Sequence, residues 1–485
     1  MPGKKKMKKF STKDLARIIK AHPQRDTSDE QRATSHDYFT GVSTDSRTTK
    51  TGDCFFAISG DNFDGHDFVS DAFEKGAVCA VVSREIKDSR FTDKIILVVD
   101  DTVKAIGDFA KGYRRQCTFK VVAITGSVGK TTVRQIAYHV LSQHYRVYQS
   151  PKNFNNQIGL PLSLLGADPE HQIVVVELGT NHPGEIAYLT GIAQPNIAVV
   201  TNVYPAHLEG FGDVQTIAKE KLSISEGLPT DGILIINAGI ACPELACGEL
   251  VEPVEGVLRP AGPLARIITF GKSGSSDYQA RNITPNGIGS RFIIDGAEVY
   301  LPLAGPGNIE NALAAWAVCS QFGITIDDFA QAVKTLSAVP MRAEVLQIGT
   351  LTVLNDCYNA NPASMKNALD ILANLVLKEK RRAVFICGDM AELGRQTQDL
   401  HAELGAAVAH AKVRLLLTVG KSAKIVAKAA KNAAKYDLQT KSFTDILSAC
   451  NNLKKFIKDY DIVLVKGSRV DKLEMAVRKL RELFS

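Results

Sequence analysis

The sequence lacks the features that mark membrane proteins and zinc-binding proteins. No uninterrupted apolar stretch approaches the ~20 residues that a membrane span requires. The nine cysteines are scattered, and only Cys242 and Cys247 lie close together, with no second pair to complete a zinc site. No apolar run follows the first lysines, so no signal peptide is expected. We therefore expect a cytoplasmic protein with reduced thiols and no membrane span.

Positive charge is also scarce outside the first ten residues. The formal net charge is +6, and five of these charges belong to one cluster of lysines: Lys4, Lys5, Lys6, Lys8 and Lys9. The residues after Phe10 sum to about +1, which gives no basis for a nucleic-acid surface. We interpret the lysine cluster as a solvated tail, and we expect no nucleic-acid partner.

The chain does contain a strand, a glycine turn and a helix in direct succession at 121–133, VVAITGSVGKTTV. The N–H groups of such a turn and of the helix start face a bound anion. In that arrangement Lys130 reaches the β- and γ-phosphates and the Thr131 hydroxyl binds Mg²⁺. The general pattern has a glycine at position 124, where this chain has Ile124. The sequence predicts a nucleotide triphosphate site formed by Gly126, Ser127, Val128, Gly129, Lys130, Thr131 and Thr132.

Two further strands end in residues that could bind a metal. The run IVVVELG reads as a buried parallel strand ending in Glu177, which is well placed to hold Mg²⁺ beside the phosphate loop. His207 follows the strand-like run IAVVTNV and is a plausible second ligand, although a lone histidine is more often structural. Lys219 and Lys221 lie on a later helical run, where spacing alone predicts solvated surface lysines.

Several polar clusters leave two interpretations open. Residues 43–47 and 61–66 combine Arg, His and carboxylates, and they are either Asx- and Ser-rich turns or a ligand-binding edge. Asn153, Asn155 and Asn156 form a loop that could also bind peptide or sugar groups. Asn308 and Asn311, on the first turn of a helix at 307–322, could read an adenine edge or cap the helix.

Strands that alternate with helices predict an α/β fold with mostly parallel sheets, and the length favours about three domains. We expect a basic tail and the start of the first helix region at 1–24, and a small α/β domain at 25–115. A central domain with a P-loop ATPase-like parallel sheet follows at 116–338. A doubly wound, Rossmann-like domain takes 339–485, and 114–118 is the expected linker between the first two domains.

The third domain carries polar residues at the expected carboxyl ends of its strands, where doubly wound sheets bind ligands. They are Asp356, Tyr358, Asn359, Asn361, Asp389, Glu392, Lys466, Ser468 and Arg469. A GTPase would need a guanine-reading motif, which is missing, whereas a small-molecule kinase stays possible. A ligase that activates a carboxylate fits better, because its ionised nucleophile needs cations rather than a strong general base.

Seven motifs together resemble the Mur ligases of peptidoglycan synthesis: TGSVGKTT, NFNNQIG, VVELGTNHPGEI, VTNVYPAHLEGFG, NDCYNANPASM, GDMAELG and VKGSR. The resemblance covers about residues 40 to 480, and NANPASM and GDMAELG are distinctive of the member that adds a dipeptide. One departure is Gly305-Pro306-Gly307-Asn308, where the family usually reads Gly-Arg-His-Asn. The basic N-terminal extension also lies outside the family pattern.

The resemblance implies a role for each matching residue. The first domain would hold a UDP-sugar through Ser46, Arg47, Asn62, Asp64 and His66, and Asn155 and Asn156 would touch the muramoyl peptide. Asn308, Asn311, Arg342 and Asp356 would join the phosphate loop in binding ATP. Thr131, Glu177, His207 and Lys221 would hold two Mg²⁺ ions, with Lys221 carbamylated. The dipeptide would meet Tyr358, Asn359, Asn361, Asp389, Lys466, Ser468 and Arg469. Lys130, His207, Lys221 and Arg342 would be catalytic.

The activity that the resemblance implies is two-step and ATP-dependent. D-Ala-D-Ala would be joined to UDP-N-acetylmuramoyl-tripeptide through an acyl phosphate, with ADP and phosphate released, by a monomer. Two alternatives stay open at this point. One is a related ligase that adds a single amino acid, and the other is a non-catalytic ATP-binding scaffold.

Overall fold

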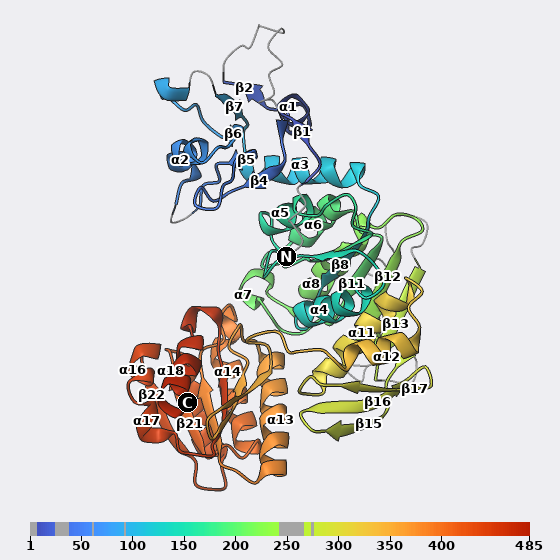
Figure 1. The fold of residues 1–485 in the computed structure, drawn as a ribbon. Helices are drawn as coiled ribbons and strands as arrows, with labels where there is room; N and C mark the ends of the chain where they lie inside the picture. Colours follow the sequence, from blue (N-terminus) through green and yellow to red (C-terminus); the bar gives the residue numbers. More distant parts are fainter. Residues whose placement is uncertain (1–6, 25–37, 61–62, 92–93, 242–265, 273–275) are drawn as a thin grey trace.

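The structure is a computed structural model that describes residues 7–24, 38–60, 63–91, 94–241, 266–272 and 276–485. It consists of three α/β parts that follow one another along the chain (Figure 1). This is the architecture that the alternation of strands and helices predicts. Asn62 and the pair Cys242 and Cys247 lie outside the described residues.

The first part is a five-stranded sheet in the order β2-β7-β6-β5-β4, parallel except for β2. Its strands are β2 (His22–Pro23), β4 (Gly41–Ser43), β5 (Asp53–Phe56), β6 (Cys79–Val82) and β7 (Ile95–Val98). Its helices are α1 (Thr12–Ile19), α2 (Val69–Glu74) and α3 (Thr102–Gln116), and β1 (Phe10–Ser11) pairs with β3 (Tyr38–Phe39). Phe10 packs edge-on against Phe109 of α3, with 5.2 Å between ring centroids.

Helix α3 forms the seam between the first and the central part. Its buried face shares one apolar core with strands β5 to β7 and with the helices of the central sheet. At its end, the Tyr113 hydroxyl donates to the Ala167 carbonyl at 2.6 Å, and the Arg114 guanidinium donates to the carbonyls of Ala193 and Gln194 at 3.1 and 3.2 Å. The linker expected at 114–118 is therefore wrong in its first half, because α3 continues to Gln116 and is packed there.

The central part is a seven-stranded parallel sheet in the order β14-β13-β12-β11-β8-β10-β9. Its strands are β8 (Lys120–Thr125), β9 (Val147–Gln149), β10 (Ile173–Glu177), β11 (Ile197–Val200), β12 (Ile233–Asn237), β13 (Arg266–Gly271) and β14 (Tyr278–Gln279). Helices α5 (Gly159–Leu165) and α6 (Glu185–Ala193) cover one face, and α4 (Lys130–Leu141), α11 (Gly307–Ser320) and α12 (Ile326–Val333) cover the other. Helices α7 (Leu208–Phe211) and α8 (Val214–Leu222) follow β11.

A small antiparallel sheet, β15-β16-β17, extends the α4 side of the central part (Figure 1). Its strands are β15 (Arg281–Asn286), β16 (Gly289–Ile294) and β17 (Ala297–Leu301). Phe292, Val299 and Leu301 are buried in the same core as α11 and α12. These residues join the small sheet to the central part.

The third part is a six-stranded sheet in the order β18-β19-β23-β20-β21-β22, parallel except for the edge strand β18. Its strands are β18 (Glu344–Ile348), β19 (Leu351–Asn355), β20 (Ala383–Cys387), β21 (Leu415–Val419), β22 (Gln439–Phe443) and β23 (Ile462–Lys466). Helices α13 (Pro362–Glu379), α14 (Thr397–His410) and α15 (Ala423–Ala433) cover one face; α16 (Ile446–Cys450), α17 (Leu453–Phe456) and α18 (Glu474–Phe484) cover the other. This is the doubly wound arrangement that was expected.

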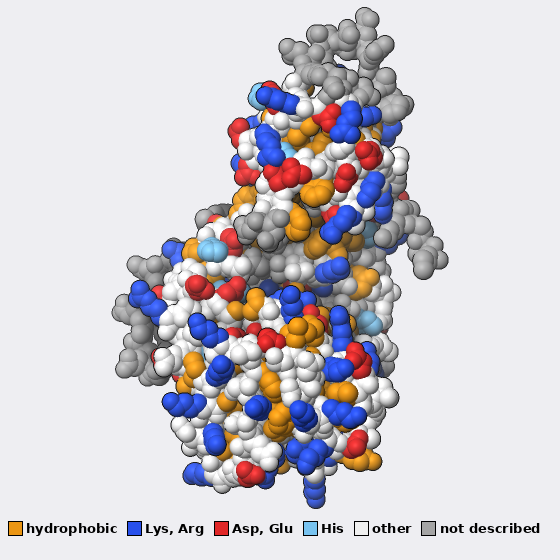
Figure 2. Space-filling model, turned by 90° about the vertical axis from the view of Figure 1, so that its left-hand side faces the viewer, with side chains coloured by type: hydrophobic (Ala, Val, Ile, Leu, Met, Phe, Trp, Pro, Cys, Tyr) orange, Lys and Arg blue, Asp and Glu red, His pale blue; other side chains and the backbone are white. Residues whose placement is uncertain are grey.

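The surface agrees with the low charge excess. Figure 2 shows Lys and Arg side chains scattered over the visible face with acidic side chains between them, rather than gathered in one basic surface. Among the helices in the described ranges, none has the length and apolar character needed to cross a membrane.

Replacing Arg114 with alanine tests the seam. The guanidinium is buried against the carbonyls that end α6, so its loss leaves these acceptors without a donor. We expect a free energy of unfolding lower by about 2 kcal/mol, measured by thermal or urea unfolding. The neighbouring Arg115 is exposed, and Arg115→Ala should change stability by no more than about 0.5 kcal/mol. Equal losses of stability in the two variants would contradict the role of Arg114 in joining the first part to the central part.

Candidate active site

The phosphate-binding turn between β8 and α4 has the backbone that only glycine accommodates. Gly126 and Gly129 have φ angles of +145° and +90°. A Cβ on Gly126 would lie 1.9 Å from Thr201 Oγ1, and one on Gly129 would lie 2.1 Å from Asn311 Oδ1. Positive φ and close neighbours together exclude a side chain at both positions. The turn delivers the chain directly into α4, whose first N–H groups have no partner inside the helix.

The end of strand β11 holds this turn in place. Thr201 Oγ1 donates to the Val128 carbonyl at 2.6 Å. The Asn202 side chain accepts the Val128 N–H and donates to the Val128 carbonyl, both at 2.9 Å. The Lys130 ammonium lies over the same turn and donates to the Gly126 carbonyl at 2.6 Å. The lysine is thus positioned at the place where a phosphate would meet the turn.

One buried carboxylate, Glu177 at the end of β10, faces this turn. Its Oε2 accepts a hydrogen bond from Thr131 Oγ1 at 3.3 Å, and its Oε1 lies 2.9 Å from Nη1 of Arg134. Arg134 also donates to the Lys152 carbonyl at 2.9 Å. Burial lowers the pKa of Lys130 to about 8, with Glu177 opposing this shift and Arg342 adding to it. Positive charge therefore exceeds negative charge around the turn.

The Thr131–Glu177 pair fits a magnesium ion. Mg²⁺ prefers oxygen ligands and usually binds through one or two carboxylates together with substrate phosphates. Glu177 Oε1 is buried and pairs with Arg134, but it accepts no hydrogen bond of good geometry from a described residue. Within the described ranges, no group of three or more His, Cys, Asp or Glu side chains is arranged to hold a metal. A site of this kind therefore depends on the phosphates for its remaining ligands.

Lys221 on α8 is buried, contrary to the surface position that its spacing suggests. The side chain is 2% exposed and forms no hydrogen bond or ion pair with any described residue. Burial lowers its pKa to about 7; nearby Lys130 adds to this shift and Glu220 opposes it. Glu220 itself accepts the N–H groups of Gly184 and Ile186, both at 2.7 Å. It therefore fixes α8 against the start of α6 and sets the direction of Lys221.

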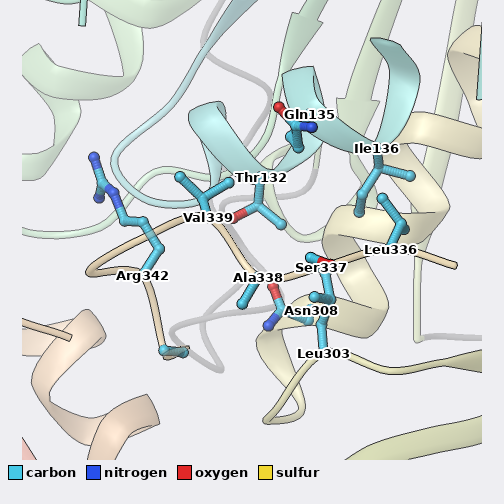
Figure 3. Close-up of a pocket in the computed structure, with 11 residues that line it drawn as sticks. Thr132, Gln135, Ile136, Leu303, Asn308, Leu336, Ser337, Ala338, Val339 and Arg342 are labelled. Carbon is cyan, nitrogen blue, oxygen red and sulfur yellow. The ribbon is translucent and has the colours of Figure 1, made fainter. Parts of the chain in front are cut away.

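A pocket beside α4 is lined by the segment that leads into the third part. Figure 3 shows this segment passing α4 from Leu336 to Arg342, with the Arg342 side chain directed away from Leu336. Thr132 and Asn308 line the same pocket. Asn308 donates to the Ala304 carbonyl at 2.7 Å and accepts a hydrogen bond from Asn311 at 2.9 Å. The two asparagines thus form a short chain between the phosphate turn and this pocket.

The third part brings a cation and a carboxylate to the same region. The Arg342 guanidinium lies 4.0 Å above the centre of the Tyr358 ring. Asp356 accepts the Ala343 N–H at 2.9 Å, and its other oxygen lies 2.6 Å from the Lys466 ammonium. This buried ion pair ties the entry of the third part to β23.

His207 contacts the third part directly. Its Nδ1 is hydrogen-bonded to the Glu392 carboxylate, and the Glu209 N–H donates to the Glu392 carbonyl at 3.1 Å. Both His207 and Glu392 have positive φ angles, +54° and +61°. Two loops from different parts of the chain therefore meet at these residues.

Comparison with known families agrees with this site. The Mur ligase family catalytic domain matches residues 38–114, the Mur ligase middle domain matches 124–319, and the Mur ligase glutamate ligase domain matches 341–469. The chain belongs to the Mur ligase family. The three-domain fold expected from the resemblance is confirmed.

Two relatives of this Mur ligase are UDP-N-acetylmuramoyl-tripeptide–D-alanyl-D-alanine ligases. The Bacillus subtilis enzyme is 33% identical over 482 residues, which are 98% of this chain and 99% of the relative. The Escherichia coli enzyme is 36% identical over 448 residues, which are 91% of this chain and 93% of the relative.

Two similar crystal structures are those of MurF from Acinetobacter baumannii and of MurF ligase from Thermotoga maritima in complex with ADP. The first is 28% identical with a TM-score of 0.83, covering 98% of this chain and 99% of that chain. The second is 26% identical with a TM-score of 0.77, covering 91% of this chain and 97% of that chain. The likeness extends over all three domains.

In this Mur ligase, the residues expected to bind the UDP-sugar are partly engaged with one another. His66 is buried, with Nδ1 2.6 Å from Asp64 and Nε2 accepting the Ser83 N–H at 2.9 Å. Both ring nitrogens are therefore occupied, which favours a structural role for His66. Arg47 is exposed and pairs only with Asp45, while the Ser46 carbonyl accepts the Lys75 ammonium. Their contacts with a ligand stay predictions.

The residues expected at the dipeptide site do gather at one edge, because β19, β23 and β20 are neighbours. Most of them already bond within the protein. Asp389 accepts the N–H groups of Lys421 and Ala423 at the start of α15, and Asn361 caps α13. Ser468 donates to Asp471, Arg469 pairs with Glu474, Asn359 accepts the Ala360 N–H, and Lys466 bonds Asp356 and Asn359. Their contacts with substrate also stay predictions.

Asn155 and Asn156 hold the loop before α5. The Gly179 N–H donates to the Asn155 carbonyl at 2.7 Å, and Asn156 Oδ1 accepts the Gly159 N–H at 2.9 Å. The loop is thereby fixed beside the end of β10, where a muramoyl peptide is expected.

Sequence reasoning missed four residues that shape this site. Arg134, Asn202 and Glu220 were not singled out, and Glu392 was noted only as a strand-end residue. A signal exists for two of them: Asn202 lies two residues after the end of β11, and Arg134 lies one turn after Lys130 on the same face of α4. Nothing in local spacing distinguishes Glu220, whose partners lie more than thirty residues away.

Two glycine substitutions distinguish the loss of phosphate binding from the effect of backbone strain alone. Gly129→Ala should abolish detectable ADP binding in a calorimetric titration, because the new Cβ collides with Asn311 as well as occupying an unfavourable φ. Gly184 has a similar φ of +87° at the start of α6, but a Cβ there meets nothing within 4 Å. Gly184→Ala should therefore lose about 1 kcal/mol of stability and keep wild-type ADP affinity. Normal ADP binding by Gly129→Ala would contradict the assignment of the turn.

Proposed function

We propose that this Mur ligase is an ATP-dependent, ADP-forming ligase that joins D-Ala-D-Ala to UDP-N-acetylmuramoyl-tripeptide in peptidoglycan precursor synthesis. The observation that carries the proposal is the near full-length match to two relatives with this name. The cluster of Lys130, Glu177 and Arg342 supports it, because activation of a carboxylate by ATP needs cations around the phosphates. A similar structure contains ADP.

Each domain takes one substrate in this proposal. Residues up to 115 bind the UDP-sugar, residues 116–338 bind ATP, and residues 339–485 bind the dipeptide. The boundary expected after residue 24 is not kept, because α1 and β2 lie within the first domain. The enzyme acts as a monomer in the cytoplasm. The seven cysteines among the described residues are free thiols, which suits a reducing compartment.

In the first step, the terminal carboxylate of the tripeptide attacks the γ-phosphorus of ATP. The bond between that phosphorus and the oxygen that bridges the β- and γ-phosphates breaks. ADP departs, and the tripeptide carboxylate has become an acyl phosphate. Lys130 and Arg342 lower the repulsion between the two anions, and the turn at 126–129 holds the phosphate chain through its N–H groups. Mg²⁺ bound by Thr131 and Glu177 would supply further charge neutralisation at the phosphate oxygens. Asn308, Asn311 and Asp356 orient the nucleoside.

Lys221 and His207 belong to the same centre in this proposal. A buried ammonium beside Lys130 would repel a metal ion, so Lys221 fits a cation site only after its amine has reacted with CO₂ to form a carbamate. Its lowered pKa favours the neutral amine that this reaction needs. The carbamate and His207 would be the side chains that hold a second Mg²⁺.

In the second step, the free amine of D-Ala-D-Ala attacks the acyl carbon. The bond to the phosphate oxygen breaks, phosphate leaves, and the new amide nitrogen loses its proton. Water would hydrolyse the acyl phosphate, so the third domain must close over it. In this proposal the dipeptide binds at the strand ends that carry Asp389, Ser468 and Arg469 as that domain closes.

A phosphate-release assay with each substrate omitted in turn tests the reaction. We expect release only when ATP, UDP-muramoyl tripeptide and D-Ala-D-Ala are all present, and loss of release in Lys130→Ala. Release with a free amino acid in place of the dipeptide would instead indicate the single-amino-acid ligase. No release with all substrates, by a protein that still binds ADP, would indicate the scaffold.

Lys221→Ala tests the carbamate. We expect kcat to fall by about 100-fold or more, with partial recovery when short-chain carboxylic acids are added to replace the lost carboxylate. The matched control is Lys219→Ala on the same helix, because Lys219 is exposed and should leave kcat unchanged. If no short acid restores any activity to Lys221→Ala, the carbamate loses its support.

A further inference from the structure

Glu392 lies in a contact between the central and third domains that the proposed reaction does not use. Apolar residues from both domains share one core beside it: Leu208 and Phe211 from α7, and Met390 and Leu393 from the third domain. A Cβ on Gly394 would lie 3.2 Å from the Cα of Glu209, so the two loops approach closely. The contact is therefore packed as well as charged.

The loop that carries Glu392 is held rigidly by a fully buried histidine. His401 Nε2 accepts the Met390 N–H at 3.1 Å, and His401 Nδ1 donates to the Thr397 carbonyl at 2.7 Å. Glu392 also keeps a left-handed backbone, which for a residue other than glycine persists only when its surroundings enforce it. The carboxylate is thus delivered to a defined place when the third domain docks.

The bond between Glu392 and His207 selects one form of the imidazole. An Nδ1–H that donates to a carboxylate leaves Nε2 with its lone pair available. No described residue hydrogen-bonds to Nε2 of His207. The Glu392 carboxylate, whose side chain is 48% exposed, accepts this Nδ1–H and can therefore orient the ring.

We propose that Glu392 is a positioning residue that makes His207 ready to act only when the third domain has closed. Through Nδ1, Glu392 fixes the tautomer and the direction of His207 and leaves Nε2 without a hydrogen bond to any described residue. Carboxylate partners of this kind orient metal-binding histidines and strengthen their binding. The inference rests on the proposed role of His207 as a metal ligand, and it adds the link from domain closure to that residue.

The kinetic test compares Glu392→Ala and Glu392→Gln with Glu403→Gln. Glu403 is an exposed residue of α14 in the same domain and should behave as wild type. We expect Glu392→Ala to lower kcat 10- to 100-fold with the KM for D-Ala-D-Ala within about twofold. The kcat of Glu392→Gln should lie between those of Glu392→Ala and wild type, since its amide oxygen can still accept the Nδ1–H. A raised KM for D-Ala-D-Ala with unchanged kcat would overturn the inference, because Glu392 would then bind the dipeptide itself.

Two measurements on the same variants do not depend on turnover. Titration of Mn²⁺ in the presence of ADP, followed by electron paramagnetic resonance, should show a 10- to 100-fold weaker second ion in Glu392→Ala than in wild type. Hydrogen exchange of the Glu209 amide should stay as in wild type in Glu392→Ala, because its acceptor is the main-chain carbonyl of residue 392, which the substitution keeps. Wild-type affinity for the second ion, or faster exchange at Glu209 that shows a loosened contact between the domains, would overturn the inference. An inactive wild-type protein with all substrates would instead overturn the proposed function.

Discussion

The structure depends on an excess of buried positive charge around one turn. Lys130, Arg134, Lys221 and Arg342 surround the turn, and Glu177 is the carboxylate that faces it. Buried charges without partners cost several kcal/mol each, and the lowered pKa values of Lys130 and Lys221 reflect that cost. A triphosphate brings the missing negative charge. Because it binds only the folded chain, its binding free energy also stabilises the fold.

The three domains are joined in two different ways, and this difference matches their proposed tasks. The first and central domains share a continuous core across α3, in which Phe109 and Leu160 are both fully buried. The third domain has one core of its own, and its other core extends to Leu208 and Phe211 of α7, so it meets the central domain in a small region around His207 and Arg342. A joint of the second kind can open for substrates and close for chemistry. The nucleotide and the acid substrate therefore meet on a rigid base.

Local motifs could be predicted from sequence wherever the backbone alone carries the function. The phosphate turn is an example, because Gly126 and Gly129 need positive φ and Lys130 must start a helix. Lys221 is the opposite case, since Lys219 and Lys221 look alike in sequence. Only the packing of α8 buries one and exposes the other. The family resemblance identified Lys221, and its spacing could not.

Polar residues at strand ends show a second limit of sequence reasoning. Asp389 and His66 carry side chains that suit ligand binding, yet the fold uses one to cap α15 and the other to fasten a turn. Buried N–H groups need acceptors whether or not a ligand is present. A strand-end carboxylate can therefore bind either a ligand or a backbone N–H group. Only the three-dimensional arrangement shows that it already accepts a hydrogen bond from the backbone.

The Gly305-Pro306-Gly307-Asn308 departure from the family pattern also has a structural explanation. A Cβ on Gly307 would lie 3.0 Å from Asn367 Oδ1, and one on Gly305 would lie 2.6 Å from Ile371. Both neighbours belong to α13 of the third domain, and the Gly307 N–H donates to Asn367 at 3.3 Å. A side chain at position 307, where the family usually has His, would press on the Asn367 amide. Gly307 thus suits the close approach of α13 to the start of α11, where Asn308 and Asn311 remain beside the phosphate turn.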